Sequence, residues 1–227
     1  MPAGFFVTGT DTGIGKTVVS CALLHAFSAR GRTVIGMKPV AAGCENGQWQ
    51  DVENLKRASN VCMPQSLINP YAFVEPVAPH IAARQAGIVI DPEIIRQACE
   101  QLQAAAEVTI VEGVGGFRVP LSLSGALNPR YDTSDLARAL GLPVILVAGM
   151  RLGCLNHTLL TVRAIESAGL KLAGWVANTI DPEMLQPVAN LQTLTEWIDY
   201  PLLGVLPFQE QPDVRQFAGL IDLSRLE

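Results

Sequence analysis

Residues 5–17 read FFVTGTDTGIGKT, an apolar segment that runs through a glycine-rich loop into a Lys-Thr pair. An Ala- and Leu-rich stretch follows at once and predicts a helix. A strand, a glycine-rich loop and a helix that opens with Lys-Thr are typical of a phosphate-binding loop. The strict pattern G-x-x-x-x-G-K-[ST] is missed by one residue, because five residues separate Gly9 from Gly15 and Thr10 takes the place of the first glycine.

Each residue type in this loop suits a phosphate ligand. Gly13 and Gly15 let the backbone turn its N–H groups toward phosphate oxygens, and the start of the helix adds its positive dipole end. Lys16 can reach the β- and γ-phosphates, and the Thr17 hydroxyl can ligate magnesium. A glycine-rich turn that only caps a helix is the alternative. The coincidence of strand, loop, Lys-Thr pair and helix favours phosphate binding.

Length and composition narrow the class of protein. The chain has 227 residues, of which 49% are hydrophobic and 16% charged, so it can bury a substantial core, and we predict one domain over residues 1–227. The longest apolar run, near residues 143–150, is far shorter than the roughly 20 residues that cross a bilayer, and the N-terminus lacks the basic start of a signal peptide. We therefore expect no membrane partner.

Charge and cysteine usage exclude further classes. The net charge of -5 argues against a nucleic-acid partner, since nucleic-acid backbones attract basic surfaces. The five cysteines are odd in number and scattered without a C-x-x-C pair, which argues against a disulfide framework and a zinc site. The three histidines also lack ligand spacing. A cytoplasmic protein is expected.

Apolar runs and helical patterns alternate along the chain. The runs predict strands at residues 5–8, 34–38, 108–111, 144–148, 172–178 and 202–206, and the helical patterns fall at residues 17–29, 52–58, 92–105, 133–140, 157–168 and 184–198. The strands are apolar throughout, as in sheets covered on both faces. We predict a doubly wound α/β fold of the P-loop NTPase type, with a mostly parallel sheet and helices on both faces. Residues 41–50 and 120–132 are expected to be loops at the active edge.

Four polar residues are candidates for the site, two at predicted strand ends and two at predicted helix starts. Glu112 ends a buried strand and is expected to point into the phosphate crevice as a magnesium ligand, directly or through water. Lys38 ends another strand and is either an ordinary surface charge or a second cation for an anionic substrate. Asp51 favours a helix N-cap on its own sequence context, and so does Asn156, which could alternatively mark an anion site.

Several long segments together resemble the dethiobiotin synthetases. They are FVTGTDT at residues 6–12, KPV at 38–40, NPYAF at 69–73, VEG at 111–113, LGCLNH at 152–157 and LAGWVAN at 172–178, followed by the region of Pro207. The resemblance implies an ATP- and magnesium-dependent cyclo-ligase. In that family CO2 or bicarbonate supplies a carbamate on 7,8-diaminononanoate, ATP phosphorylates it, and the second amine closes the ring of dethiobiotin, which is the penultimate step of biotin biosynthesis.

The resemblance also implies roles for residues of this chain. Lys38, Lys16 and Thr12 would be catalytic, and Thr17, Asp51 and Glu112 would hold magnesium, which replaces the cap interpretation of Asp51. ATP would be bound by Gly13, Ile14, Gly15, Lys16, Thr17, Val18, Asp51, Glu112, Gly113, Val114, Gly115, Asn178, Thr179, Pro207, Phe208 and Gln209. Substrate would be bound by Thr12, Lys38, Ala42 and Asn156. Asn156 would receive the substrate carboxylate from a neighbouring subunit, which implies a homodimer with its substrate site at the subunit interface.

Two positions depart from that family pattern. Ala42 stands where a hydroxyl is usual and Gly13 where an acidic side chain is common, so substrate contacts there are lost or made by backbone. Two other functions compete with this interpretation. One is another P-loop ligase, such as an amidating synthetase, and the other is a nucleotide switch of the ParA or MinD type. The mixed charges of residues 213–227 make a poor membrane anchor, which disfavours the switch.

Overall fold

The computed structural model describes residues 3–122 and 130–226. In this part of the chain, a six-stranded sheet has the order β2-β5-β1-β6-β7-β8. Its strands are β1 (Ala3–Gly9), β2 (Val34–Met37), β5 (Val108–Glu112), β6 (Val144–Met150), β7 (Leu172–Thr179) and β8 (Leu202–Leu206). Every neighbouring pair is parallel, which confirms the predicted sheet.

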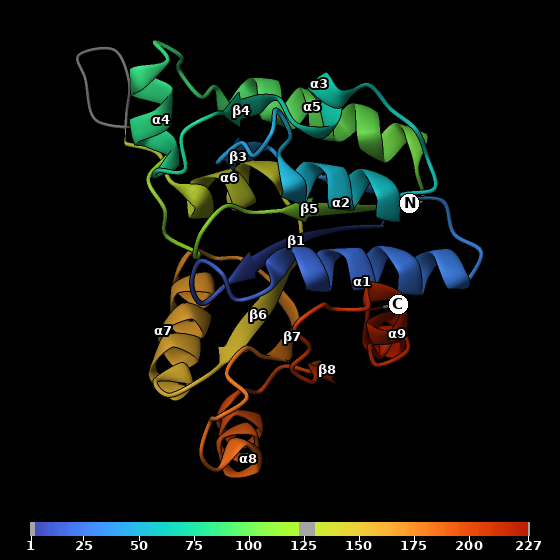
Figure 1. Ribbon diagram of the computed structural model, residues 1–227, viewed down its shortest axis with the longest axis vertical. Helices are drawn as coiled ribbons and strands as arrows, with labels where there is room; N and C mark the ends of the chain where they lie inside the picture. Colours follow the sequence, from blue (N-terminus) through green and yellow to red (C-terminus); the bar gives the residue numbers. More distant parts are fainter. Residues whose placement is uncertain (1–2, 123–129, 227) are drawn as a thin grey trace.

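Helices cover both faces of this sheet (Figure 1). On one face, α1 (Lys16–Ala29) packs beside α9 (Val214–Ala218) and against α2 (Gln50–Ala58). The other face carries α5 (Pro92–Ala105), α6 (Thr133–Leu140), α7 (Cys154–Ser167) and α8 (Pro187–Trp197). Successive side chains of β1 point to opposite faces of the sheet. Phe5 and Val7 therefore pack in the core on the α1 face, and Phe6 packs in the core on the α5 face. The doubly wound fold is confirmed.

Some short elements were not predicted from the sequence. A second, two-stranded sheet pairs β3 (Val40–Ala42) with β4 (Tyr71–Phe73), and the chain also forms α3 (Gln65–Ile68), α4 (Pro79–Gln85), α9 and η1 (Leu223–Arg225). The prediction of a loop at residues 41–50 is therefore wrong for its first residues, which lie in β3. Most of the loop expected at residues 120–132 lies outside the described residues, and Pro120 and Asp132 at its ends form an antiparallel bridge.

Two predicted helix caps are wrong. Helix α2 begins at Gln50 with Trp49 as its N-cap, so Asp51 lies in the first turn, where its carboxylate contacts Lys38 and Thr17 instead. Helix α7 begins at Cys154, earlier than predicted, because Gly153 adopts a φ of 93° and serves as the N-cap. Asn156 therefore lies inside the first turn.

No helix in the described ranges has both the length and the apolar character that a membrane crossing requires.

Two tryptophans provide a matched test of this packing. Trp175 on β7 is 0% exposed, whereas Trp197 at the end of α8 is 69% exposed. Trp175→Ala leaves a cavity between the sheet and α7, so we expect it to lower the free energy of unfolding by about 3–5 kcal/mol. Trp197→Ala should cost less than about 1 kcal/mol. Urea denaturation measures both, and equal losses would contradict the fold.

Candidate active site

The phosphate-binding loop connects β1 to α1. Gly13 and Gly15 have φ values of 73° and 85°, which glycine adopts without strain. Asn178 at the end of β7 donates from Nδ2 to the Ile14 carbonyl over 2.8 Å and supports the loop from the sheet. A Cβ on Gly15 would lie 2.2 Å from the same nitrogen. Position 15 therefore requires glycine for two reasons, its positive φ and the close approach of the Asn178 side chain.

Thr10, which replaces the first glycine of the strict motif, ties the loop to β6. The Gly149 N–H donates to the Thr10 hydroxyl over 3.3 Å, and the Thr10 N–H donates to the Val147 carbonyl over 3.1 Å. The loop is thus held by β6 as well as by Asn178 of β7. The departure from the strict pattern adds an anchoring side chain without removing a glycine of positive φ.

A compact group of charged and polar side chains lies beside the loop. We call Thr17, Lys38, Asp51 and Glu112 the carboxylate–lysine cluster. Lys38 Nζ lies 2.5 Å from Glu112 Oε1 and 2.9 Å from Asp51 Oδ2. Thr17 Oγ1 lies 2.9 Å from both Asp51 Oδ1 and Glu112 Oε1, and its single proton can be donated to one of them at a time.

Four separate elements bring this cluster together. Thr17 lies in the first turn of α1, Asp51 lies in the first turn of α2, Lys38 directly follows β2, and Glu112 ends β5. Because β2 and β5 are parallel neighbours, their carboxyl ends lie at the same edge. Lys38 and Glu112 are 3% and 1% exposed, so their ion pair is shielded from water. The sequence prediction that these ends meet at the phosphate loop is confirmed.

Burial and mutual attraction set the charges of the cluster. Burial disfavours the charge of Lys38, but attraction by Glu112 and Asp51 prevails and raises its pKa. Although burial opposes the shift, Lys38 also lowers the pKa of Asp51. Burial, followed by repulsion from Lys38, lowers the pKa of Lys16 to about 8. Lys38 is therefore a firmly held cation, whereas Lys16 carries its charge less readily.

The cluster has one acceptor that no neighbour satisfies. Glu112 Oε2 is buried and lacks a hydrogen-bond partner among the described residues. A buried, unpaired carboxylate oxygen is costly, and a cation would satisfy it. No group of three or more His, Cys, Asp or Glu side chains in residues 3–122 and 130–226 could hold a metal by itself. Magnesium needs less, since it binds through one or two carboxylates, waters and substrate phosphates.

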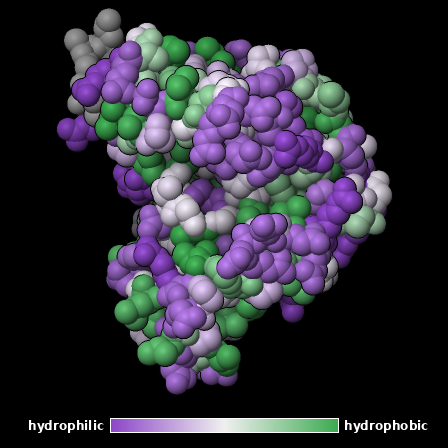
Figure 2. All heavy atoms as spheres, in the orientation of Figure 1, coloured by the Kyte–Doolittle hydropathy of each residue, from purple (hydrophilic) through white to green (hydrophobic). Residues whose placement is uncertain are grey.

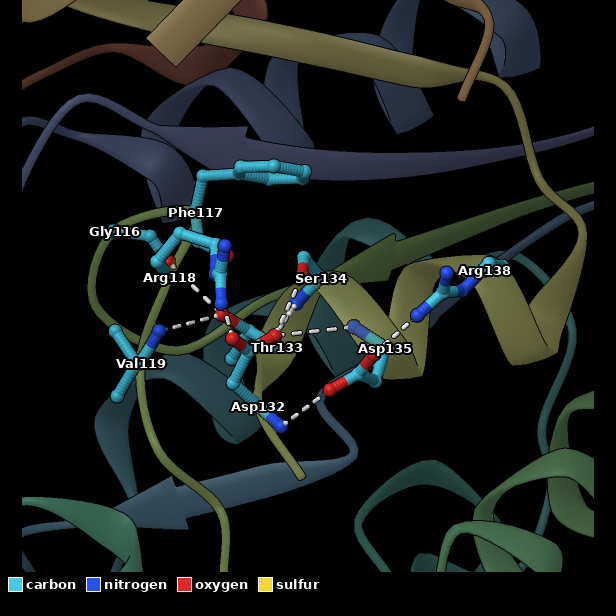
Figure 3. A network of polar contacts seen from close by, with 9 residues as sticks. All are labelled: Gly116, Phe117, Arg118, Val119, Asp132, Thr133, Ser134, Asp135 and Arg138. Carbon is cyan, nitrogen blue, oxygen red and sulfur yellow. Dashed lines mark hydrogen bonds and ion pairs between the residues drawn. The ribbon is translucent and has the colours of Figure 1, made fainter. Parts of the chain in front are cut away.

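The glycine-rich segment after β5 is anchored to the start of α6 (Figure 3). The Thr133 hydroxyl donates to the Phe117 carbonyl over 2.6 Å and accepts from the Val119 N–H over 2.9 Å. Asp132 caps α6 and binds Arg118 Nε over 2.6 Å. These contacts hold the segment that begins at Gly113, whose carbonyl lies 3.3 Å from Lys38 Nζ.

Two pockets flank the loop and the cluster. One, of about 270 Å³, unites Gly13, Gly15 and Val18 with residues from the ends of β7 and β8, namely Asn178, Thr179, Pro207, Phe208 and Gln209. The other, of about 330 Å³, is lined by Ala42, Trp49 and Asp51 among others. The sequence prediction assigned all the residues named for the first pocket to ATP, and in the second pocket it assigned Ala42 to substrate and Asp51 to ATP and magnesium, but it did not include Trp49. The roles of these residues toward nucleotide and substrate remain predictions.

The other predicted residues lie at the borders of this arrangement. Thr12 is exposed, and its hydroxyl would meet a Cβ on Gly115 at 3.5 Å. Asn156 lies in the first turn of α7 and lines neither pocket. Sequence reasoning missed Asp11 and Arg151, which form an ion pair at the loop. Asp11 stands within the loop motif, but no spacing rule connects it with a residue 140 positions away.

Two glycine substitutions separate backbone strain from crowding. Alanine at either Gly13 or Gly15 must adopt a positive φ, at a cost of about 1–2 kcal/mol. Only at Gly15 does the new Cβ collide with Asn178, since nothing lies within 4 Å at Gly13. Gly15→Ala should therefore weaken ATP binding at least tenfold more than Gly13→Ala, a difference of about 1.4 kcal/mol. Calorimetric titration of ATP measures both, and equal affinities would argue against the observed loop packing.

Comparison with known proteins places the chain in a family. The AAA domain family matches residues 3–215. The ATP-dependent dethiobiotin synthetase BioD of Nitrosospira multiformis is 57% identical over 226 residues, which cover 100% of this chain and 97% of that protein. Its counterpart in Aromatoleum aromaticum is 56% identical and covers 98% of each chain.

The solved structure of the cell division ATPase MinD from Pyrococcus furiosus has a TM-score of 0.58 over 100% of both chains. At 18% identity this likeness shows the P-loop fold alone. The synthetases, in contrast, are 56–57% identical to this chain along nearly their whole length. The chain therefore belongs to the family of ATP-dependent dethiobiotin synthetases.

Proposed function

We propose that this protein catalyses the ATP-dependent closure of a cyclic urea on 7,8-diaminononanoate with CO2 to give dethiobiotin. One amine adds to CO2 and loses a proton to form a carbamate. A carbamate oxygen then attacks the γ-phosphorus of ATP, and the bond to ADP breaks. The second amine attacks the activated carbonyl carbon and expels phosphate. ADP, phosphate and dethiobiotin are the products.

The carboxylate–lysine cluster beside the phosphate loop is the observation that carries this proposal. A phosphoryl group that moves between two anionic partners needs cations on both sides. The chain provides Lys16 from the loop and Lys38 from the end of β2, and both are largely buried. Together with magnesium, these two lysines would flank the transferred phosphoryl group.

ATP fits the loop and the pocket beside it. Residues 13–18 would hold the phosphates through their N–H groups and Lys16. The adenine would occupy the pocket formed by Thr179, Pro207, Phe208 and Gln209, where Phe208 offers an apolar surface. Asn178 would support the loop through its hydrogen bond to the Ile14 carbonyl. That bond uses one of its amide N–H groups, so fewer remain to contact the adenine. Gly113, Val114 and Gly115 would border the transferred phosphate.

Thr17, Asp51 and Glu112 would hold magnesium. The free oxygen Glu112 Oε2 and the Thr17 hydroxyl supply oxygen ligands of the kind that this ion prefers. Bound there, magnesium would neutralise charge on the β- and γ-phosphates. Lys38 contacts Glu112 Oε1 and Asp51 Oδ2 but not Glu112 Oε2, so this lysine and the ion would share the cluster rather than exclude each other.

The diamine would enter the pocket of about 330 Å³ that Asp51 connects to the cluster. Lys38 would offset charge on the carbamate oxygens, and Thr12 would contact the same group from the loop. Ala42 lines this pocket without a hydroxyl, so a polar contact there must come from backbone. Bicarbonate supplies the reacting CO2, because the two interconvert in water.

A homodimer would complete the substrate site. Asn156 and the first turn of α7 would bind the substrate carboxylate of the neighbouring subunit, because α7 lacks a side-chain cap. Leu152 is 92% exposed beside this turn, and apolar side chains also lie on the surface of α7 and α8 (Figure 2). Exposed apolar groups of this kind suit an interface. In this proposal residues 1–227 act as one domain in the reducing cytoplasm, where the five free cysteines persist.

ADP release by the purified protein tests the proposed function. The assay contains ATP, magnesium and bicarbonate, with and without 7,8-diaminononanoate. We expect ADP to form only with the diamine and dethiobiotin to appear in equal amount. ADP release that does not need the diamine would favour a nucleotide switch. No release with either mixture would point to a ligase for another substrate.

Substitution of the two lysines should separate binding from chemistry. Lys16→Ala removes the cation nearest the phosphates, so both ATP affinity and turnover should be lost. Lys38→Ala should retain ATP binding but lower turnover by about a hundredfold or more, as for loss of one electrostatic stabiliser. Calorimetry of ATP binding and the coupled ADP assay measure these effects. Normal turnover in Lys38→Ala would remove Lys38 from the catalytic centre.

A further inference from the structure

Arg151 contacts the phosphate loop from the carboxyl end of β6. It follows Met150, the last residue of that strand, and its Nη2 lies 2.7 Å from Asp11 Oδ2. The Gly149 N–H contacts the Thr10 hydroxyl two residues earlier. The end of β6 therefore holds two consecutive loop residues, one through a backbone donor and one through an ion pair.

Asp11 connects Arg151 to two groups of the phosphate loop, the Thr12 N–H and the Lys16 ammonium. Its second carboxylate oxygen, Oδ1, accepts the Thr12 N–H over 2.8 Å. Its backbone carbonyl accepts Lys16 Nζ over 2.9 Å. Asp11 thus contacts a loop N–H, the loop lysine and the arginine at once. Any shift of Asp11 changes the positions of Thr12 and Lys16.

We propose that Arg151 is a positioning residue that sets the phosphate loop for ATP through Asp11. The proposal rests on the proposed function, in which Lys16 holds the ATP phosphates and Thr12 contacts the carbamate. Without the guanidinium, the Asp11 carboxylate is free to rotate into the crevice, where its negative charge would repel the phosphates. Arg151 both fixes the geometry of Asp11 and neutralises that charge.

The exposure of the pair argues against a role in stability. The side chains of Arg151 and Asp11 are 42% and 46% exposed. Exposed ion pairs contribute about 0–1 kcal/mol to folding. The pair Arg163–Glu166 on α7, with an N–O distance of 3.1 Å, has the same chemistry away from the loop and is a matched control. A difference between the two pairs in ATP binding therefore measures positioning.

The test compares Arg151→Gln, Arg151→Lys, Asp11→Asn and the double variant Arg151→Gln/Asp11→Asn. Binding of a non-hydrolysable ATP analogue with magnesium is measured by calorimetry without the diamine, so the result does not depend on which substrate is turned over. The affinity for the analogue should fall about tenfold in Arg151→Gln, at the lower end of losses for residues that orient ligands through a neighbour. Arg151→Lys should recover most of it, and Arg163→Gln should bind as the unchanged protein does.

The pair should also behave as one unit. Asp11→Asn keeps an oxygen for the Thr12 N–H but loses the charge that holds Arg151. Because both residues act through the same contact, the double variant should lose no more than the worse single variant. In steady-state assays the KM for ATP should rise while the KM for the diamine stays constant, with no change in the melting temperature.

Unaltered analogue affinity in Arg151→Gln would overturn the proposal. Strictly additive losses in the double variant would do the same, because they would place the two residues in separate roles. A selective rise in the KM for the diamine would show that Arg151 contacts that substrate directly. A melting temperature lowered by several degrees in Arg151→Gln, with a matching loss of binding, would assign the pair to stability.

Discussion

The buried ion pair between Lys38 and Glu112 is the interaction on which the active site depends. Two charges removed from water are costly, and their attraction offsets this only when geometry and further hydrogen bonds are favourable. Here Asp51, Thr17 and the Gly113 carbonyl provide those contacts. Loss of one partner from such a pair typically costs about 3–5 kcal/mol, because it leaves an unpaired charge. An arrangement this expensive, with one carboxylate oxygen still unsatisfied, is explained better by catalysis than by stability.

The parallel sheet supplies the rigidity that this pair requires. The neighbours β2 and β5 deliver Lys38 and Glu112 to the same edge, and β1 delivers the phosphate loop beside them. β6 and β7, on the other side of β1, hold that loop through Gly149, Arg151 and Asn178. The same scaffold occurs in MinD, which shares the fold at 18% identity. Because a shared fold does not fix function, the proposed ligase chemistry depends on the side chains placed at these strand ends.

Sequence predicted the long elements and their meeting point, because apolar strands and a glycine-rich loop have strong local patterns. It could not predict β3 and β4, whose three residues each are too short to show periodicity. Local sequence context favoured Asp51 as a helix cap, an interpretation that only the family resemblance replaced. An acid in the first turn and an acid at the cap differ by only two positions in the chain, and tertiary contacts decided between them. The ion pair of Asp11 with Arg151 was also out of reach, since it forms only when β1 and β6 lie side by side.

The position of the bound metal tests the central claim most directly. Crystals grown with manganese in place of magnesium and a non-hydrolysable ATP analogue would reveal it by anomalous scattering. We expect one peak bonded to the Thr17 hydroxyl and the analogue phosphates, with Asp51 and Glu112 oxygens around it and Lys38 still beside Glu112. A peak remote from the carboxylate–lysine cluster, or bound analogue with no peak, would show that these residues form a structural ion-pair network rather than a catalytic centre.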